Sequence, residues 1–417
     1  MKIYLINLLN IISCYYSYAI FGLSASSISS YFMPGEEKID KLFSFFVIYA
    51  ALSIVKPLGS LIFGYIADKD NRVKSIFIST IISSISMFLV AAIPGYHVWG
   101  NVSICFLIFV RAIFLLTINS ESDIIRIFLV EYTDLDNKFL INAIVSFCAQ
   151  IGVVLAALSY YLTSGAITEY WKINFIIGGI LGGVISILQY YFYIRLKLYK
   201  NNLKYIKCIT DFGVFSTIKR YKLQFISFVL LHGSIGGLYN FWIIFFSNFQ
   251  DKIYNIQYVT QSQLSMILVI IYSLSLLLSG IVTKNINFLI QVKISLALSI
   301  ILSFIMVFFY MNLQDSCSFY LVIYIHISIV FLMPFYIIPI HSKIQSILGY
   351  EVRARLYSLA HSLGSVLLSS SAPIISILLW NKTKLIYIVL FYPMLFLFSI
   401  AIFFCVLSRS SYLSIGK

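Results

Sequence analysis

Charged residues are scarce in this chain of 417 residues. Asp, Glu, Lys and Arg make up 11% of it, whereas soluble domains carry about 25%. Hydrophobic residues make up 61%, and the mean hydropathy is +0.96. So much apolar surface can be buried only in lipid. The composition therefore excludes a secreted domain, a nucleic-acid-binding protein and a soluble enzyme, and it predicts a polytopic all-α membrane protein in a lipid bilayer.

Several kinds of site are also missing from the sequence. The six cysteines are scattered without a C-x-x-C pair or any Cys/His ligand spacing, which argues against a disulfide framework and a metal site. No Walker-type loop or dinucleotide fingerprint occurs, so we expect no nucleotide or other cofactor. Acidic residues number 15 against 29 basic ones. We interpret this excess of basic residues as a sign of how the chain is oriented in the membrane, because Lys and Arg collect in cytoplasmic loops.

Apolar runs of about 20 residues, the length needed to cross a bilayer, indicate twelve transmembrane helices. The first of them continues too long for a signal peptide, and no small-residue cleavage pattern follows it. The predicted spans are 8–32, 43–67, 75–95, 103–130, 139–164, 171–194, 223–247, 260–283, 286–311, 318–347, 354–380 and 385–408.

The sixth and seventh spans are separated by a long basic segment, residues 195–222. Its basic residues are Arg195, Lys197, Lys200, Lys204, Lys207, Lys219, Arg220 and Lys222. The positive-inside rule places this linker, and with it both termini, in the cytoplasm. Six helices on each side of such a linker are typical of a transporter built from two repeats. We therefore predict an N-terminal half, 1–194, and a C-terminal half, 223–417.

A run of glycine and charged residues follows the second predicted span. Gly64, Asp68, Lys69, Arg72 and Lys74 resemble the loop signature of the major facilitator superfamily, G-x-x-x-D-[RK]-x-G-R-[RK]. Asn71 replaces its glycine and Val73 is inserted between its basic residues. The resemblance implies a gating latch, in which Asp68 caps a helix N-terminus, where the helix dipole favours an anion.

Other motifs resemble one branch of that superfamily, the metabolite:proton symporters, which include the proline/betaine transporters. Lys56–Pro57–Leu58–Gly59 is similar to its R-P-L-G run. Glu121, ten residues before Glu131–Tyr132, is similar to its helix-4 pattern. The resemblance implies symport of a small polar metabolite, such as a proline/betaine-like zwitterion or an organic acid, together with protons.

Ionisable side chains inside spans are costly and usually functional or paired. Lys56 lies near mid-bilayer, and Arg111, Asn119 and Arg126 share one face of the fourth span. We predict that these four residues bind substrate. The only carboxyl groups well inside a span are Glu121 and Asp123, and we predict that Glu121 above all carries the coupling proton, because Asp123 lies three residues from Arg126. The alternative is that both acids merely neutralise the nearby cations.

Three further residues are candidates for substrate binding. Tyr239 and Trp242 of the seventh span could form an aromatic wall suited to a quaternary ammonium group, although ordinary packing is the alternative. His361 could bind substrate or relay protons, or simply bond a neighbouring helix.

The sequence therefore predicts a multi-pass carrier of the plasma (bacterial inner) membrane, functional as a monomer, that works by alternating access and is not an enzyme. Cys14–Tyr18 stands where the resembled branch has two acids, which favours uncoupled facilitation or exchange of organic anions as the alternative. A non-transporting sensor or decayed carrier is the third possibility.

Overall fold

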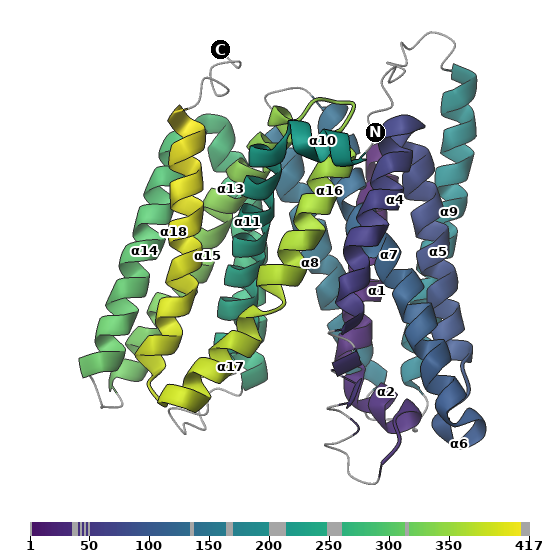
Figure 1. Cartoon of the computed structure of the whole chain (residues 1–417), viewed down its shortest axis with the longest axis horizontal. Helices are drawn as coiled ribbons and strands as arrows, with labels where there is room; N and C mark the ends of the chain where they lie inside the picture. The colour runs from purple at the N-terminus through teal and green to yellow at the C-terminus, as the bar shows by residue number, and fades with distance from the viewer. Residues whose placement is uncertain are drawn as a thin grey trace. The chain divides into compact units, whose positions relative to one another are not determined.

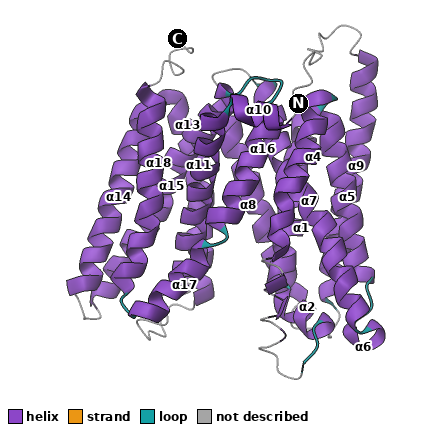
Figure 2. Cartoon of the chain, in the orientation of Figure 1, coloured by secondary structure: helices purple, strands orange, loops and turns teal. Residues whose placement is uncertain are grey.

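The chain is helical throughout its described part (Figure 1). The computed structural model describes residues 2–35, 41, 44–45, 47–48, 51–133, 137–163, 170–199, 214–247, 261–312 and 317–409. In these ranges every regular element is a helix (Figure 2). Eleven helices or helix runs among them are long and apolar enough to cross a membrane. The all-α membrane fold that the composition predicts is thus confirmed.

The predicted spans differ from the observed helices in four places. The span 223–247 is divided into α11 (Lys222–Tyr239) and η4 (Asn240–Phe246). The first span is divided into α1 (Lys2–Leu23) and α2 (Ala25–Phe32), and the span 354–380 into α16 (Arg353–Gly364), η5 (Ser365–Ser369) and α17 (Ala372–Thr383). The predicted span 43–67 includes residues outside the described part, and its described end is η1 (Ser53–Val55) and α4 (Lys56–Lys69). The middle of the predicted linker, residues 200–213, also lies outside the described part.

One compact unit, which we call unit 1, comprises residues 1–132, 148–220 and 349–362. In addition to α1, α2, η1 and α4, it contains the first part of α16 and the second part of α8 (Lys138–Thr163). Its remaining helices are α5 (Arg72–Ala92), α6 (Tyr96–Trp99), α7 (Asn101–Glu131), α9 (Trp171–Tyr199) and α10 (Val214–Arg220). α7 packs against α1, α4 and α5, so its residues lie at the centre of this unit.

A second compact unit, unit 2, comprises residues 133–147, 221–348 and 363–417. Its helices, besides the first part of α8 and the end of the α16–α17 run, are α11 (Lys222–Tyr239), the π-helical η4 (Asn240–Phe246), α13 (Gln261–Asn285), α14 (Phe288–Asn312), α15 (Cys317–Ile347) and α18 (Ile386–Arg409). α18 packs against α11 and α14, and α15 against α13 and α14. Residues 133–147 thus belong to unit 2 and residues 349–362 to unit 1.

Glycine permits the close approach of α4 to α7 in unit 1. A Cβ atom added to Gly59 would lie 1.7 Å from the carbonyl oxygen of Leu116, a distance that no side chain can adopt. The contact lets the backbones of α4 and α7 approach closely.

Substitution of Gly59 with alanine is therefore expected to destabilise the fold. We expect a loss of about 3 kcal/mol, at the upper end of what overpacking usually costs, because the obstacle is backbone. Gly22 of α1 is the matched control, since its added Cβ would meet no atom within 4 Å. Its alanine variant should stay within about 1 kcal/mol of the parent. Thermal unfolding of the two variants side by side tests this, and equal melting temperatures would contradict it.

Candidate functional site

Helix α7 places three ionisable side chains inside unit 1. Arg111 and Glu121 are 1% exposed and Asp123 is 2% exposed, although all three lie in a strongly apolar membrane span. Asn119 and Arg126 of the same helix are half-buried. Burial of charged groups is costly unless they are paired and hydrogen-bonded, so the partners of each decide what it can do.

Glu121 is held by side chains from two other helices. Asn10 of α1 donates from Nδ2 to Glu121 Oε1 at 2.9 Å, and the Thr80 hydroxyl of α5 lies 2.8 Å from the same oxygen. The second carboxyl oxygen, Oε2, is buried and makes no hydrogen bond to the described residues. Oε1 is thus fixed by two hydrogen bonds, whereas Oε2 can take up a proton.

Thr80 can adapt to either protonation state of Glu121. Its Oγ1 lies 2.8 Å from the carbonyl oxygen of Ile76 as well as 2.8 Å from Glu121 Oε1. A hydroxyl group has one hydrogen, so it can donate to only one of these oxygens at a time. Turned toward Glu121, it donates to Oε1, which accepts both in the carboxylate and in the acid protonated at Oε2; turned toward Ile76, it leaves Asn10 as the donor to Oε1. Rotation of one hydroxyl group therefore accommodates both forms.

Lys56 and Arg111, two of the predicted substrate-binding residues, meet at Tyr18 of α1. The Lys56 ammonium donates to the Tyr18 hydroxyl at 3.2 Å and lies 5.0 Å from its ring centroid. The Arg111 guanidinium lies 5.8 Å from the same ring, 3.9 Å from the ring of Phe21 and 4.6 Å from that of Phe114. Two buried cations are thus brought together on aromatic faces, an arrangement that attracts an anion.

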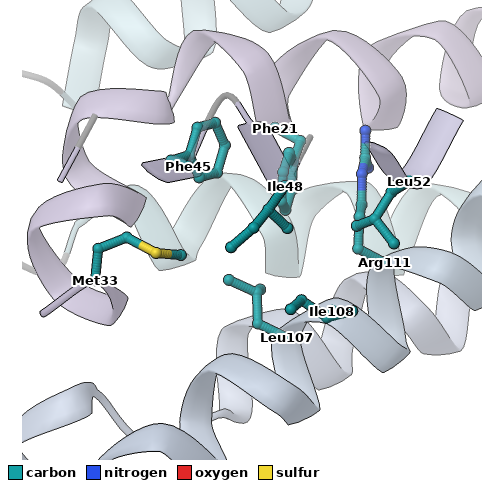
Figure 3. A pocket seen from close by; sticks show the side chains of 8 residues that line it. All are labelled: Phe21, Met33, Phe45, Ile48, Leu52, Leu107, Ile108 and Arg111. Carbon is teal, nitrogen blue, oxygen red and sulfur yellow. The ribbon is translucent and has the colours of Figure 1, made fainter. Parts of the chain in front are cut away.

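A pocket opens beside Arg111. Arg111 and Met33 lie at opposite ends of it in Figure 3, with apolar side chains between them. The residues that line it are Phe21, Met33, Phe45, Ile48, Leu52, Leu107, Ile108 and Arg111.

Asp123 is paired with His361. The Nδ1 atom of His361 lies 2.9 Å from each carboxylate oxygen of Asp123, and the imidazole is more accessible than the acid. Sequence spacing suggests Arg126, three residues away on α7, as the partner of Asp123, whereas the contact described here comes from α16. The described contact of His361 is therefore with a carboxyl group of α7.

Asp68 joins the end of α4 to the start of α16. Its carboxylate accepts from the backbone N–H groups of Ala354, at 3.1 Å, and Arg355, at 2.9 Å, and it forms a buried ion pair with Arg72. This is the cap contact that the family resemblance implies. Because the first N–H groups of a helix have no partner within it, a carboxylate there satisfies them and the helix dipole together.

Arg72 extends the same network to α7 and to the residues before α16. It donates to Glu131 from Nε at 3.3 Å and from Nη2 at 3.2 Å, and to the carbonyl oxygen of Tyr350 at 2.9 Å. Arg353 donates to Glu131 at 2.9 Å. Gly64 allows α16 to come close, since a Cβ there would lie 2.8 Å from the Cα of Arg355.

Two other members of the latch motif make contacts near the helix ends. Lys69 donates to the hydroxyl of Tyr65 at 2.7 Å, and Lys74 forms an exposed ion pair with Asp70 at 2.6 Å. Both contacts are local to the helix ends. Among the contacts described here, those of Asp68 and Arg72 join the ends of α4 and α5 to α16 and α7.

Tyr239 and Trp242 belong to unit 2. The Tyr239 ring lies 5.2 Å from that of Tyr272, and Trp242 is 1% exposed among Phe241, Phe246 and His326. The Nε2 atom of His326 contacts the carbonyl oxygen of Trp242 at 2.8 Å. Trp242 thus packs against side chains of its own unit. Such contacts are those of ordinary packing, the alternative to an aromatic wall for the substrate.

Sequence analysis misses the residues that complete these sites. Asn10 is an amide inside an apolar run, a signal that could have been used, but Thr80 is one of many hydroxyl residues on α5 and carries no such signal. The pairing of Glu131 with Arg353 joins residues 222 positions apart. In the part of the chain that the structure describes, no three His, Cys, Asp or Glu side chains could hold a metal ion together.

Comparison with known proteins agrees with this architecture. Residues 6–326 match the sequence model of the Major Facilitator Superfamily. The chain belongs to this superfamily. It is a multi-pass membrane protein of a transporter family and not an enzyme.

Curated relatives include proton symporters. The citrate-proton symporter of Salmonella typhi is 26% identical over 180 residues, which are 42% of this chain and 42% of that protein. The proline/betaine transporter of Escherichia coli (strain K12) is 26% identical over 177 residues, 40% of this chain and 35% of the relative. The resemblance to metabolite:proton symporters is thus confirmed, over less than half the length of either relative.

Solved structures share the fold over nearly the whole chain. The proton:xylose symporter XylE superimposes with a TM-score of 0.74 at 14% identity, covering 96% of this chain and 94% of its own. A bacterial homologue of the iron transporter ferroportin gives a TM-score of 0.74 at 13% identity, with coverage of 97% and 99%. These likenesses establish the two-halved major facilitator fold alone.

Proposed function

We propose that the chain is a proton-coupled symporter of a small carboxylate-bearing metabolite, either a proline/betaine-like zwitterion or an organic acid, that works by alternating access. The proposal rests on the buried ionisable side chains of α7. One helix holds a buried cation, Arg111, next to Lys56, and ten residues further along it holds a buried carboxyl group, Glu121. Ionisable groups at such depth in a membrane span usually mark a substrate or proton pathway.

The residues have separate roles in this proposal. Lys56 and Arg111 bind the carboxylate of the substrate, and Asn119 and Arg126 line the route along the same helix. Glu121 exchanges the coupling proton, for which Thr80 and Asn10 supply partners in both protonation states. Asp123 and His361 form a second group able to exchange protons.

The Asp68–Arg72–Glu131 network acts as the gating latch of the cycle. It fixes the start of α16 to α4, α5 and α7, so each transport cycle has to break and remake these contacts. Lys69, Lys74 and Gly64 support the latch locally, by helix-end contacts and by close packing. Of the two aromatic candidates in unit 2, Tyr239 is kept as a substrate contact, whereas Trp242 is packed within the unit.

The proposed location is the bacterial inner membrane, with both termini in the cytoplasm and the monomer as the working unit. The basic segment 195–222 supports this orientation by the positive-inside rule.

Uptake into proteoliposomes tests the proposal. Labelled proline, glycine betaine and citrate are offered with and without an inward proton gradient. We expect at least one of them to accumulate only when the gradient is present, because substrate entry is tied to proton entry. Entry that is equal with and without the gradient would contradict symport.

Uncoupled facilitation of an organic anion is the second candidate. It is favoured by the neutral residues at Cys14 and Ser17 of α1, where the related branch carries acids. Under this alternative, uptake in the same assay would follow the substrate gradient alone.

A further inference from the structure

Two prolines of unit 2 leave backbone carbonyl groups without their usual hydrogen-bond donor. In an α-helix each carbonyl group accepts from the N–H group four residues further along, and proline has no N–H group. Pro339 lies inside α15 and therefore frees the carbonyl group of Phe335. Pro373 lies in the first turn of α17 and frees that of Ser369, the last residue of η5. In an apolar span a freed carbonyl group needs another partner, because lipid offers no hydrogen bond.

A glutamine of α14 supplies the partner in α15. Gln291 is 6% exposed, and its Nε2 atom donates to the carbonyl oxygen of Phe335 at 3.0 Å. The same amide nitrogen lies 3.2 Å from the hydroxyl oxygen of Ser279 on α13. Three helices of unit 2 therefore meet where α15 lacks a backbone hydrogen bond.

An asparagine supplies the partner at the second proline. Asn240, the first residue of η4, donates from Nδ2 to the carbonyl oxygen of Ser369 at 2.7 Å and to its hydroxyl oxygen at 2.9 Å. Gly236, four residues before Asn240, permits this approach, because a Cβ atom there would lie 2.5 Å from the same hydroxyl oxygen. Both freed carbonyl groups are thus bonded to an amide side chain from another helical segment.

Buried hydroxyl groups of the same unit behave differently. Ser295, Ser299 and Ser303 each donate to the carbonyl oxygen four residues earlier on their own helix, α14. Those carbonyl groups also have a backbone donor, because no proline stands four residues after them. Gln291 and Asn240, in contrast, reach another segment and contact two carbonyl groups that have lost this donor.

Such contacts allow a helix to bend at a defined point. Bending an ordinary helix strains its backbone hydrogen bonds, whereas here one of these bonds is replaced by a bond to a flexible side chain that can follow the carbonyl group. The run from α16 to α17 needs this freedom, since it passes from unit 1 to unit 2 after residue 362 and its start is held in unit 1 by Asp68. Movement of the two halves in a transport cycle has to be taken up along such a run.

We propose that Gln291 and Asn240 are positioning residues, each of which replaces the backbone donor that a proline removes and thereby forms a hinge. One hinge lies at Phe335 in α15 and the other at Ser369, between η5 and α17. The part of the hinges in transport rests on the proposed function, whereas the replacement of the backbone donors does not.

Double-mutant cycles test the replacement by thermal unfolding of the full chain in lipid nanodiscs. Gln291→Leu leaves the carbonyl group of Phe335 without a donor and should lower the melting temperature by about 2–4 °C. In the Pro339→Ala background residue 339 has an N–H group, so the loss caused by Gln291→Leu should be less than half as large. Asn240→Leu and Pro373→Ala form the second cycle, with the same expectation. Losses that are equal with and without the proline, in both cycles, would overturn the proposal.

Gln189→Leu is the matched control for the loss of a buried amide. Gln189 of α9 is 5% exposed, like Gln291, but its side chain makes no hydrogen bond to the described residues. Its replacement by an apolar residue should leave the melting temperature unchanged or raise it. A fall as large as that in Gln291→Leu would show that any buried glutamine matters equally, and would overturn the role of the Phe335 contact.

Transport kinetics test the hinges themselves, with the labelled substrate that the parent protein accumulates. Pro339→Ala and Pro373→Ala restore a backbone donor, so bending then breaks a backbone hydrogen bond. The maximal rate of uptake should fall about fivefold in each variant, the factor that corresponds to about 1 kcal/mol, the net contribution of one hydrogen bond. The KM should stay as in the parent, because neither proline is proposed to touch the substrate, and Gln189→Leu should change neither quantity.

A parental maximal rate in both proline variants would overturn the hinges. Failure of the proposed function has a different signature, since it would leave the parent protein itself without uptake. The unfolding cycles need no substrate, so they decide the replacement of the backbone donors in either case.

Discussion

Replacement of Glu121 with glutamine is expected to abolish accumulation of substrate while leaving its passive entry intact. The amide is close to the acid in shape and can still accept from Asn10 and Thr80, which contact Oε1 at 2.9 and 2.8 Å. What it loses is the exchangeable proton. A gradient of one pH unit coupled one to one sustains about tenfold accumulation, since a factor of ten corresponds to about 1.4 kcal/mol. In the variant we expect equal concentrations inside and outside.

The control is Glu351→Gln, which removes a carboxyl group from an exposed position of unit 1. It should accumulate substrate as the parent does. Accumulation that survives in Glu121→Gln would assign the proton to another group, and the Asp123–His361 pair is the next candidate because its imidazole and carboxylate lie 2.9 Å apart.

Replacement of Asp68 with asparagine is expected to reduce both stability and transport. Asp68 is buried, accepts two backbone N–H groups of α16 and pairs with Arg72. Removing one partner of a buried ion pair leaves the other charge uncompensated and costs about 3–5 kcal/mol. We expect the melting temperature to fall by several degrees and the transport rate to fall with it, because the start of α16 is no longer fixed.

The same loop supplies a matched control for that variant. Asp70 pairs with Lys74 across the same four-residue spacing, but both side chains are exposed, at 43% and 47%. Exposed pairs contribute about 0–1 kcal/mol, so Asp70→Asn should leave both stability and transport nearly unchanged. Equal effects of Asp68→Asn and Asp70→Asn would contradict the role of Asp68 as the cap of α16.

Much of the fold can be predicted from the sequence because its determinants are local. Apolar runs set the helices, and a short motif of glycine and charged residues marks the loop between α4 and α5. The position of Asp68 at a helix N-terminus is what the resemblance of that motif to the superfamily's loop signature implies. The breaks in the helices near residues 23 and 364 could not be predicted, because each break falls within a continuous run of apolar or small residues.

The site is less predictable because its contacts join distant segments. His361 reaches Asp123 across 238 residues of chain, and Asn10 reaches Glu121 across 111. Helical spacing can suggest only partners on the same helix, such as Arg126 for Asp123. The cluster of Lys56 and Arg111 on Tyr18 depends on the packing of three helices, which no local pattern encodes. Position deep within a predicted span can single out such residues but not their neighbours.

The most direct test of symport is proton movement driven by substrate alone. Purified protein is placed in liposomes that contain a pH-sensitive dye, with equal pH on both sides and the membrane potential clamped at zero, and proline, glycine betaine or citrate is added outside. Protein-free liposomes are treated in the same way, so that any passive change of the interior pH is subtracted. The account predicts that one of these substrates acidifies the interior in the parent protein and not in Glu121→Gln. Substrate entry without any acidification would contradict proton coupling and leave an uncoupled facilitator.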